Sequence, residues 1–196
     1  VFFLARILGA LYFINNINED DLVKRCRRAL WGNTALFLVF FLAFVIRTLL
    51  ADGYAVRPET GEVFMEPYKY LTNFLQMPVV LLVFLVGVVA VLWGIIRTLW
   101  KPAFDKGIWF AGAGTVLTVL ALLLVAGYNN TAYYPSTHDL QSSLTLANSC
   151  SSQFTLKVMA YVSILVPFVL AYIFYAWRSI DNRKIDAKEM EEGGHA

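Results

Sequence analysis

Two arginines stand within apolar runs, where an ionised side chain is costly and marks a candidate functional site. Arg6 lies eleven residues before Ile17. At about 1.5 Å per residue, Arg6 is then about 16 Å from that end, near the middle of a bilayer. Two interpretations stay open: an ion pair with a carboxylate outside this sequence, or a role in a proton or quinone path. Arg47 lies three residues from the end of its run, so it can reach the interface and needs no such role.

Side chains that could bind a metal are few and far apart in the sequence. The histidines and cysteines are His138, His195, Cys26 and Cys150, and neither cysteine has a Cys or His at zinc-site spacing. Haem in a helical bundle needs an axial ligand, and Met159 is the only methionine well inside an apolar run. A single Met there is more typical of core packing. We therefore predict no metal site and no haem bound by this chain.

Composition narrows the class of protein. The chain has 196 residues, of which 59% are hydrophobic and 15% charged, whereas soluble domains carry about 25% charged residues. Sixteen basic and fourteen acidic residues leave a net charge of +2. This balance excludes a disordered chain and a nucleic-acid-binding tail. The class that remains is a membrane protein.

The apolar residues fall into runs long enough to cross a bilayer, which takes about 20 residues. The complete runs are residues 32–50, 75–96, 108–128 and 158–177, and a shorter one covers residues 1–17. The short run has no basic flank or cleavage site of a signal peptide, so we expect it to be the end of a transmembrane helix. The fold class is then all-α: a polytopic transmembrane helix bundle with four complete spans and a partial N-terminal span. Residues 1–178 would form the bundle, and residues 179–196 a cytoplasmic polar tail.

Basic residues set the expected orientation. Lys and Arg gather in residues 18–31, in residues 97–106 and in the tail, whereas residues 129–154 contain none. Because basic connections stay in the cytoplasm, we expect a multi-pass protein of the cytoplasmic membrane with a cytoplasmic C-terminus.

Small residues and one proline indicate how the helices pack. Ala103, Gly107, Ala111 and Thr115 recur every fourth residue, which predicts a close helix contact. Pro167 lies inside the last run and should kink that helix.

The last third of the chain carries a family resemblance. Its motifs are Tyr134-Pro135-Ser136, Ser143-Leu144-Thr145-Leu146-Ala147-Asn148-Ser149, Thr155-Leu156-Lys157-Val158-Met159 and the helix exit Tyr175-Ala176-Trp177-Arg178. On these residues the chain resembles subunit II of the cytochrome bd quinol oxidases. That family has eight helices in two related halves, so the chain is similar to the end of helix four followed by helices five to eight.

The resemblance implies a function. Such a chain would be a non-haem-binding structural subunit of a bacterial or archaeal terminal oxidase that oxidises quinol and reduces dioxygen to water. The partner, subunit I, would carry haems b and d and the catalytic residues. Quinone and the lipid bilayer are the other expected partners, nucleic acid is not one, and a small accessory subunit is left open. The alternative from the residues alone is a fragment of a transporter or permease, although no Asp or Glu lies in any span.

Overall fold

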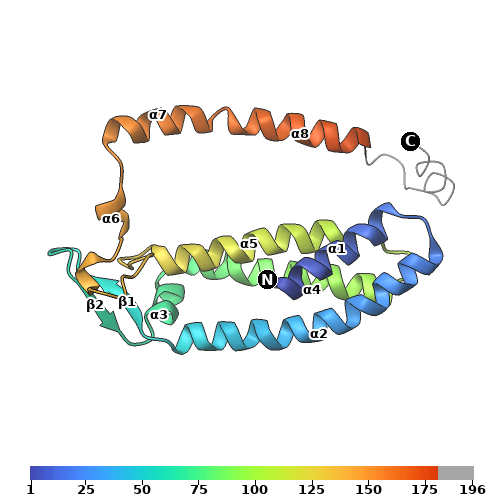
Figure 1. The fold of residues 1–196 in the computed structure, drawn as a ribbon, viewed down its shortest axis with the longest axis horizontal. Helices are drawn as coiled ribbons and strands as arrows, with labels where there is room; N and C mark the ends of the chain where they lie inside the picture. Colours follow the sequence, from blue (N-terminus) through green and yellow to red (C-terminus); the bar gives the residue numbers. More distant parts are fainter. Residues whose placement is uncertain (181–196) are drawn as a thin grey trace.

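The computed structural model describes residues 1–180. In chain order its elements are α1 Phe2–Asn16, α2 Asp20–Leu50, β1 Gly53–Val56, β2 Val63–Glu66, α3 Lys69–Gln76, α4 Pro78–Trp100, α5 Gly107–Gly127, the 3-10 turn η1 Leu140–Ser142, α6 Leu146–Ser149, α7 Gln153–Ser163 and α8 Val166–Ile180 (Figure 1). In this part of the chain, α2, α4, α5 and the α7–α8 unit are long and apolar enough to cross a membrane, and α1 is a shorter apolar helix. The predicted all-α polytopic bundle is confirmed. Most of the predicted tail, including His195, lies outside the described residues.

Helix α2 begins well before the predicted span 32–50. Residues 20–31, expected as part of a connection, form its first turns, and only residues 17–19 separate α2 from α1. Asp20 and Asp21 lie in the first turn, where carboxylates favour the positive end of the helix dipole. Neither proline nor glycine interrupts residues 20–31, so the helix continues from the basic segment into the apolar one.

The α4–α5 contact depends on small residues. A Cβ added at Gly94 would lie 2.7 Å from the Gly107 carbonyl oxygen and 3.0 Å from the Ala111 nitrogen. Gly107 and Ala111 are buried in this contact, as the every-fourth-residue pattern predicts, whereas Ala103 is exposed ahead of α5. Apolar side chains then complete the core around α1, α2, α4 and α5, namely Ile7, Leu11, Leu30, Val91 and Ile95.

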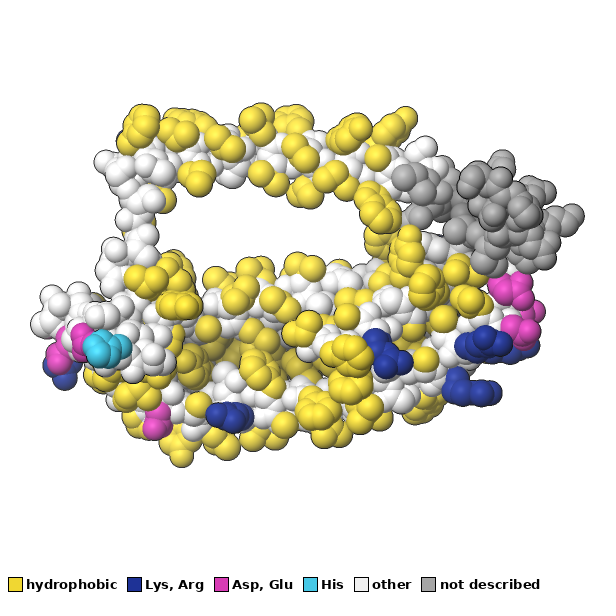
Figure 2. Space-filling model, in the orientation of Figure 1, with side chains coloured by type: hydrophobic (Ala, Val, Ile, Leu, Met, Phe, Trp, Pro, Cys, Tyr) yellow, Lys and Arg dark blue, Asp and Glu magenta, His cyan; other side chains and the backbone are white. Residues whose placement is uncertain are grey.

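The last predicted span consists of two helices. α7 ends at Ser163 and α8 begins at Val166, one residue before Pro167, so the helix is interrupted where the proline was predicted to disturb it. The break is bridged by short-range bonds, in which Ile164 N–H donates to the Tyr161 oxygen and Leu165 N–H donates to the Val162 oxygen. The most apolar stretch of this unit has no buried residue, and Figure 2 shows open space between it and the bundle.

A small β-hairpin, which the sequence analysis did not predict, covers one end of the bundle. β1 and β2 pair antiparallel, with Tyr54 opposite Met65. The segment after α5 lies along β1, because Ala132 N–H donates to the Tyr54 oxygen over 2.9 Å. Gln141 binds the other strand, since its side chain donates to the Val63 oxygen and accepts from the Val63 N–H. The loops at this end of the bundle therefore form one folded cap.

Candidate functional site

Arg6 lies on the outward face of α1. Ile7, Leu11 and Ile14 on the opposite face are buried against the bundle, whereas Arg6 is exposed. Its guanidinium lies 5.6 Å from the centroid of the Phe2 ring, within the range of a cation–π contact. No ion pair involves Arg6 within residues 1–180. The described bundle therefore provides an aromatic neighbour for this charge, but not a carboxylate.

Arg47 differs from Arg6 in its position along the helix. It lies in the last turn of α2 and is exposed, close to the end of the span. Within the described residues no ion pair joins Arg47 to Asp52, which follows the helix. Its place at the helix end fits a side chain that reaches the interface.

Side chains that could ligate a metal do not gather at one place within the described residues. No group of three His, Cys, Asp or Glu side chains within them could hold a metal ion. Met159 is 64% exposed on α7. The apolar groove between α1, α2, α4 and α5, of about 330 Å³, has no His, Cys, Met or Tyr among its described lining residues. Its polar lining residues Thr115 and Thr118 already donate to the Ala111 and Gly114 carbonyl oxygens.

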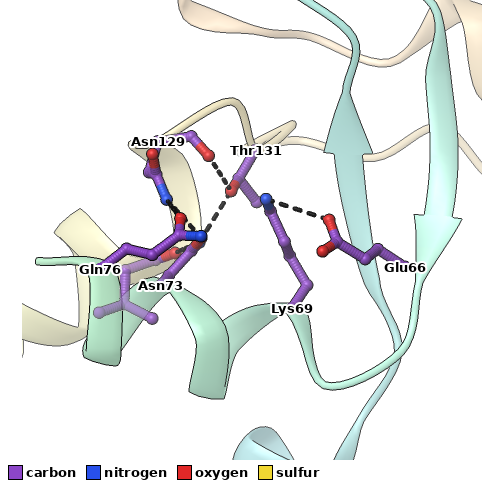
Figure 3. A network of polar contacts seen from close by, with 7 residues as sticks. Glu66, Lys69, Asn73, Gln76, Asn129 and Thr131 are labelled. Carbon is purple, nitrogen blue, oxygen red and sulfur yellow. Dashed lines mark hydrogen bonds and ion pairs between the residues drawn. The ribbon is translucent and has the colours of Figure 1, made fainter.

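A buried amide organises the polar contacts under the cap (Figure 3). Asn73 of α3 is fully buried and donates to the Val125 oxygen over 2.9 Å and to Thr131 Oγ1 over 2.8 Å. Its Oδ1 accepts from Asn129 Nδ2 over 3.1 Å, and the same Nδ2 donates to Gln76 Oε1 over 2.6 Å. Asn73 thus satisfies a carbonyl at the end of α5 and ties the following loop to α3.

Backbone conformation brings Asn129 to this network. Asn129 and Asn130 both adopt positive φ, 55° and 54°, directly after α5. Asparagine tolerates this left-handed region better than most residues. The two residues reverse the chain, so that Thr131 bridges to Ala55 of β1.

The hairpin sits close to α3. A Cβ at Gly53 would lie only 2.5 Å from the Lys69 Cβ, so the strand needs glycine there. Lys69 is buried and its Nζ lies 3.2 Å from Glu66 Oε2 of β2, which pairs the ammonium group (Figure 3). Burial and the neighbouring Tyr54 raise the pKa of Tyr70 above its ordinary value, so this phenol stays neutral at physiological pH.

At the opposite end of the bundle, Arg27 holds the connection after α4. Its guanidinium donates to the carbonyl oxygens of Thr98, Pro102 and Phe104. Carbonyls at a helix C-terminus lack helical partners and carry partial negative charge, so a guanidinium suits them well. The nearby Asp105 carboxylate favours the charge of this guanidinium, and the contact joins α2 to the α4–α5 connection.

Sequence analysis singled out Arg6 and Arg47, and the structure does not bring them together. It missed Asn73 and Arg27, whose roles depend on residues far away in sequence, at Val125 and in the connection after α4. One usable signal was the Asn129-Asn130 pair at a helix end, which is typical of a left-handed turn.

The fold and its apolar helices define a multi-pass helical membrane protein. A family model, described as cytochrome bd terminal oxidase subunit II, matches residues 1–180. The chain therefore belongs to the cytochrome bd terminal oxidase subunit II family. It is also 30% identical over 155 residues to cytochrome bd-I ubiquinol oxidase subunit 2 of Escherichia coli strain K12, and equally to the proteins of that name from strains O6:H1 and O157:H7. The match covers 78% of this chain and 39% of each relative, so the chain spans about two fifths of the curated relatives it matches.

Proposed function

We propose that this chain acts as a non-haem-binding structural subunit of a terminal oxidase that oxidises quinol and reduces dioxygen to water. The family match over residues 1–180 carries the proposal, because relatives of this family are subunits of a ubiquinol oxidase. In this role the bundle supports assembly with a haem-bearing subunit I, which supplies haems b and d and the catalytic residues. The apolar groove between α1, α2, α4 and α5 has a lining suited to the tail of a quinone.

We propose the same orientation as the sequence pattern predicts. The basic first turns of α2, which carry Arg27, would lie in the cytoplasm with the link before α5 and the C-terminus, and the bundle over residues 1–178 would lie in the inner membrane. The β-hairpin and the Asn73 network would then face outward. Family membership favours an oxidase subunit over a transporter fragment, although transporters also contain interrupted helices such as the α7–α8 unit.

The deciding experiment isolates the full-length protein through a tag in mild detergent. A reduced-minus-oxidised absorption spectrum is recorded beside a gel of the co-purifying chains. We expect a larger membrane partner and b- and d-type haem bands that stay with that partner when the two chains are separated. Haem that remains on the tagged chain, or a stable complex with no oxidase activity, would contradict the proposal.

Arg6 provides a second test of the same proposal. We expect Arg6→Leu to lower the amount of assembled, active oxidase about three- to tenfold, because the loss of each 1.4 kcal/mol of interaction lowers an equilibrium constant tenfold. Arg47→Leu is the matched control, since Arg47 reaches the interface, and should change little. Quinol oxidase activity per membrane and recovery of the partner chain are the readouts. Equal, wild-type-like values for both variants would remove Arg6 from the functional residues.

A further inference from the structure

A second cavity lies where α8 approaches α1 and the start of α5. It has a volume of about 920 Å³, and side chains from all three helices line it. Its basic lining residues are Lys106, directly before α5, and Arg178, in the last turn of α8. None of its described lining residues is acidic. Neither basic side chain forms an ion pair within residues 1–180. Among the described residues, the lining of the cavity therefore carries two positive charges and no negative one.

Aromatic residues place this cavity at the level of a membrane interface. Trp109, Trp177 and Tyr12 line it and remain 61%, 54% and 38% exposed. Trp and Tyr concentrate where lipid headgroups meet the hydrocarbon region. The two cations are thus held at the depth of a phosphate group, at the end of the bundle that carries the basic connections.

The wall that leads away from the cations is apolar. Leu170, Ile173 and Phe174, which precede Arg178 on α8, also line the cavity and are exposed. In Figure 2 the space between α7–α8 and the bundle continues in this direction and is bordered by hydrophobic side chains. A ligand that fills this site must have an anionic head and a long apolar body.

We propose that this cavity binds an anionic phospholipid, with its phosphate between Lys106 and Arg178 and its acyl chains along α8. The charge of the site selects the lipid class, because basic pockets between transmembrane helices bind anionic headgroups. A zwitterionic lipid presents an ammonium group that these cations repel. The lipid fastens α8 to α5, two helices that few protein contacts join in the described structure. This proposal is independent of the oxidase function.

The test uses the full-length protein with its co-purifying partners, exchanged into detergent and supplied with phosphatidylglycerol or phosphatidylcholine. Native mass spectrometry measures the fraction that retains one lipid. We expect Lys106→Gln combined with Arg178→Gln to lower phosphatidylglycerol retention about tenfold, since each cation near an anionic headgroup contributes severalfold. Phosphatidylcholine retention should be low and unchanged. The charge-conserving pair Lys106→Arg and Arg178→Lys should retain phosphatidylglycerol.

The matched control is Arg28→Gln combined with Lys101→Gln, which removes the same charge from exposed residues at the same end that do not line the cavity. An equal loss in this pair would show general surface attraction and overturn the proposal. Wild-type protein that retains no phosphatidylglycerol would also overturn the proposal. Competition by inorganic phosphate at similar concentration would identify a free-anion site and likewise overturn it.

Discussion

Gly114→Ala should destabilise the bundle, although alanine is the better helix former. An added Cβ at Gly114 would lie 2.6 Å from the Gly87 carbonyl oxygen and 2.7 Å from the Val91 nitrogen. Both atoms belong to the backbone of α4, so no side-chain rotation can relieve the overlap and the two helices must separate. Overpacking of this kind costs about 2–3 kcal/mol, which corresponds to a melting temperature lower by roughly 5–10 °C.

Gly112→Ala is the matched control for this prediction. Gly112 lies two residues earlier on α5, and a Cβ there would have nothing within 4 Å. The substitution should be neutral or stabilising by about 1 kcal/mol, because alanine gains helix propensity without a clash. The melting temperatures of the two detergent-solubilised variants are compared. Size-exclusion chromatography after heating measures the fraction that remains folded at each temperature. Equal melting temperatures would mean that α4 and α5 are not in close contact at Gly114.

The close α4–α5 contact was predictable because its signal is local. Gly107 and Ala111 are four residues apart, and this spacing alone places them on one face of a helix. Pro167 was equally informative, since a proline removes a helical donor wherever it stands. The start of α2 was not predictable from hydropathy. Residues 20–31 are polar, so they do not belong to the apolar run, yet nothing in them ends a helix.

The sequence was less informative about the ends of the bundle. The hairpin consists of two four-residue strands, whose short apolar pattern resembles a loop until the segment after α5 and Gln141 pair with it. Likewise Asn73 is one of several polar residues in a short helix, and the sequence does not distinguish it from the others. Its burial follows from the packing of α3 under the cap, and only the fold brings Val125 and Thr131 within hydrogen-bonding distance. Intramembrane charge was visible in the sequence, whereas the partners of a buried amide were not.

Asn73→Ala should therefore loosen the cap and destabilise the protein by about 3 kcal/mol. The variant removes the Asn73 hydrogen bond to the Val125 carbonyl and one of the bonds made by Thr131 and by Asn129. An unsatisfied buried group costs about 1–3 kcal/mol. Because the network joins α3 to the loop after α5, the damage should begin at the end of the bundle that the hairpin covers. Trypsin cleavage after Arg57, between β1 and β2, reports that opening, since Arg57 N–H is bound to the Glu62 oxygen while the hairpin is closed.

Gln76→Ala truncates an amide of the same short helix at the exposed edge of the network, where it accepts one hydrogen bond from Asn129. Water can replace that bond, so the change should stay within about 0.5 kcal/mol and leave cleavage at Arg57 unaltered. Both substitutions remove an amide that binds Asn129, but only Asn73 is buried. The comparison therefore measures the effect of the buried hydrogen bonds alone. If the two variants melt and cleave alike, the buried bonds of Asn73 to Val125 and Thr131 do not hold the cap, and its stability must come from the pairing of the hairpin itself.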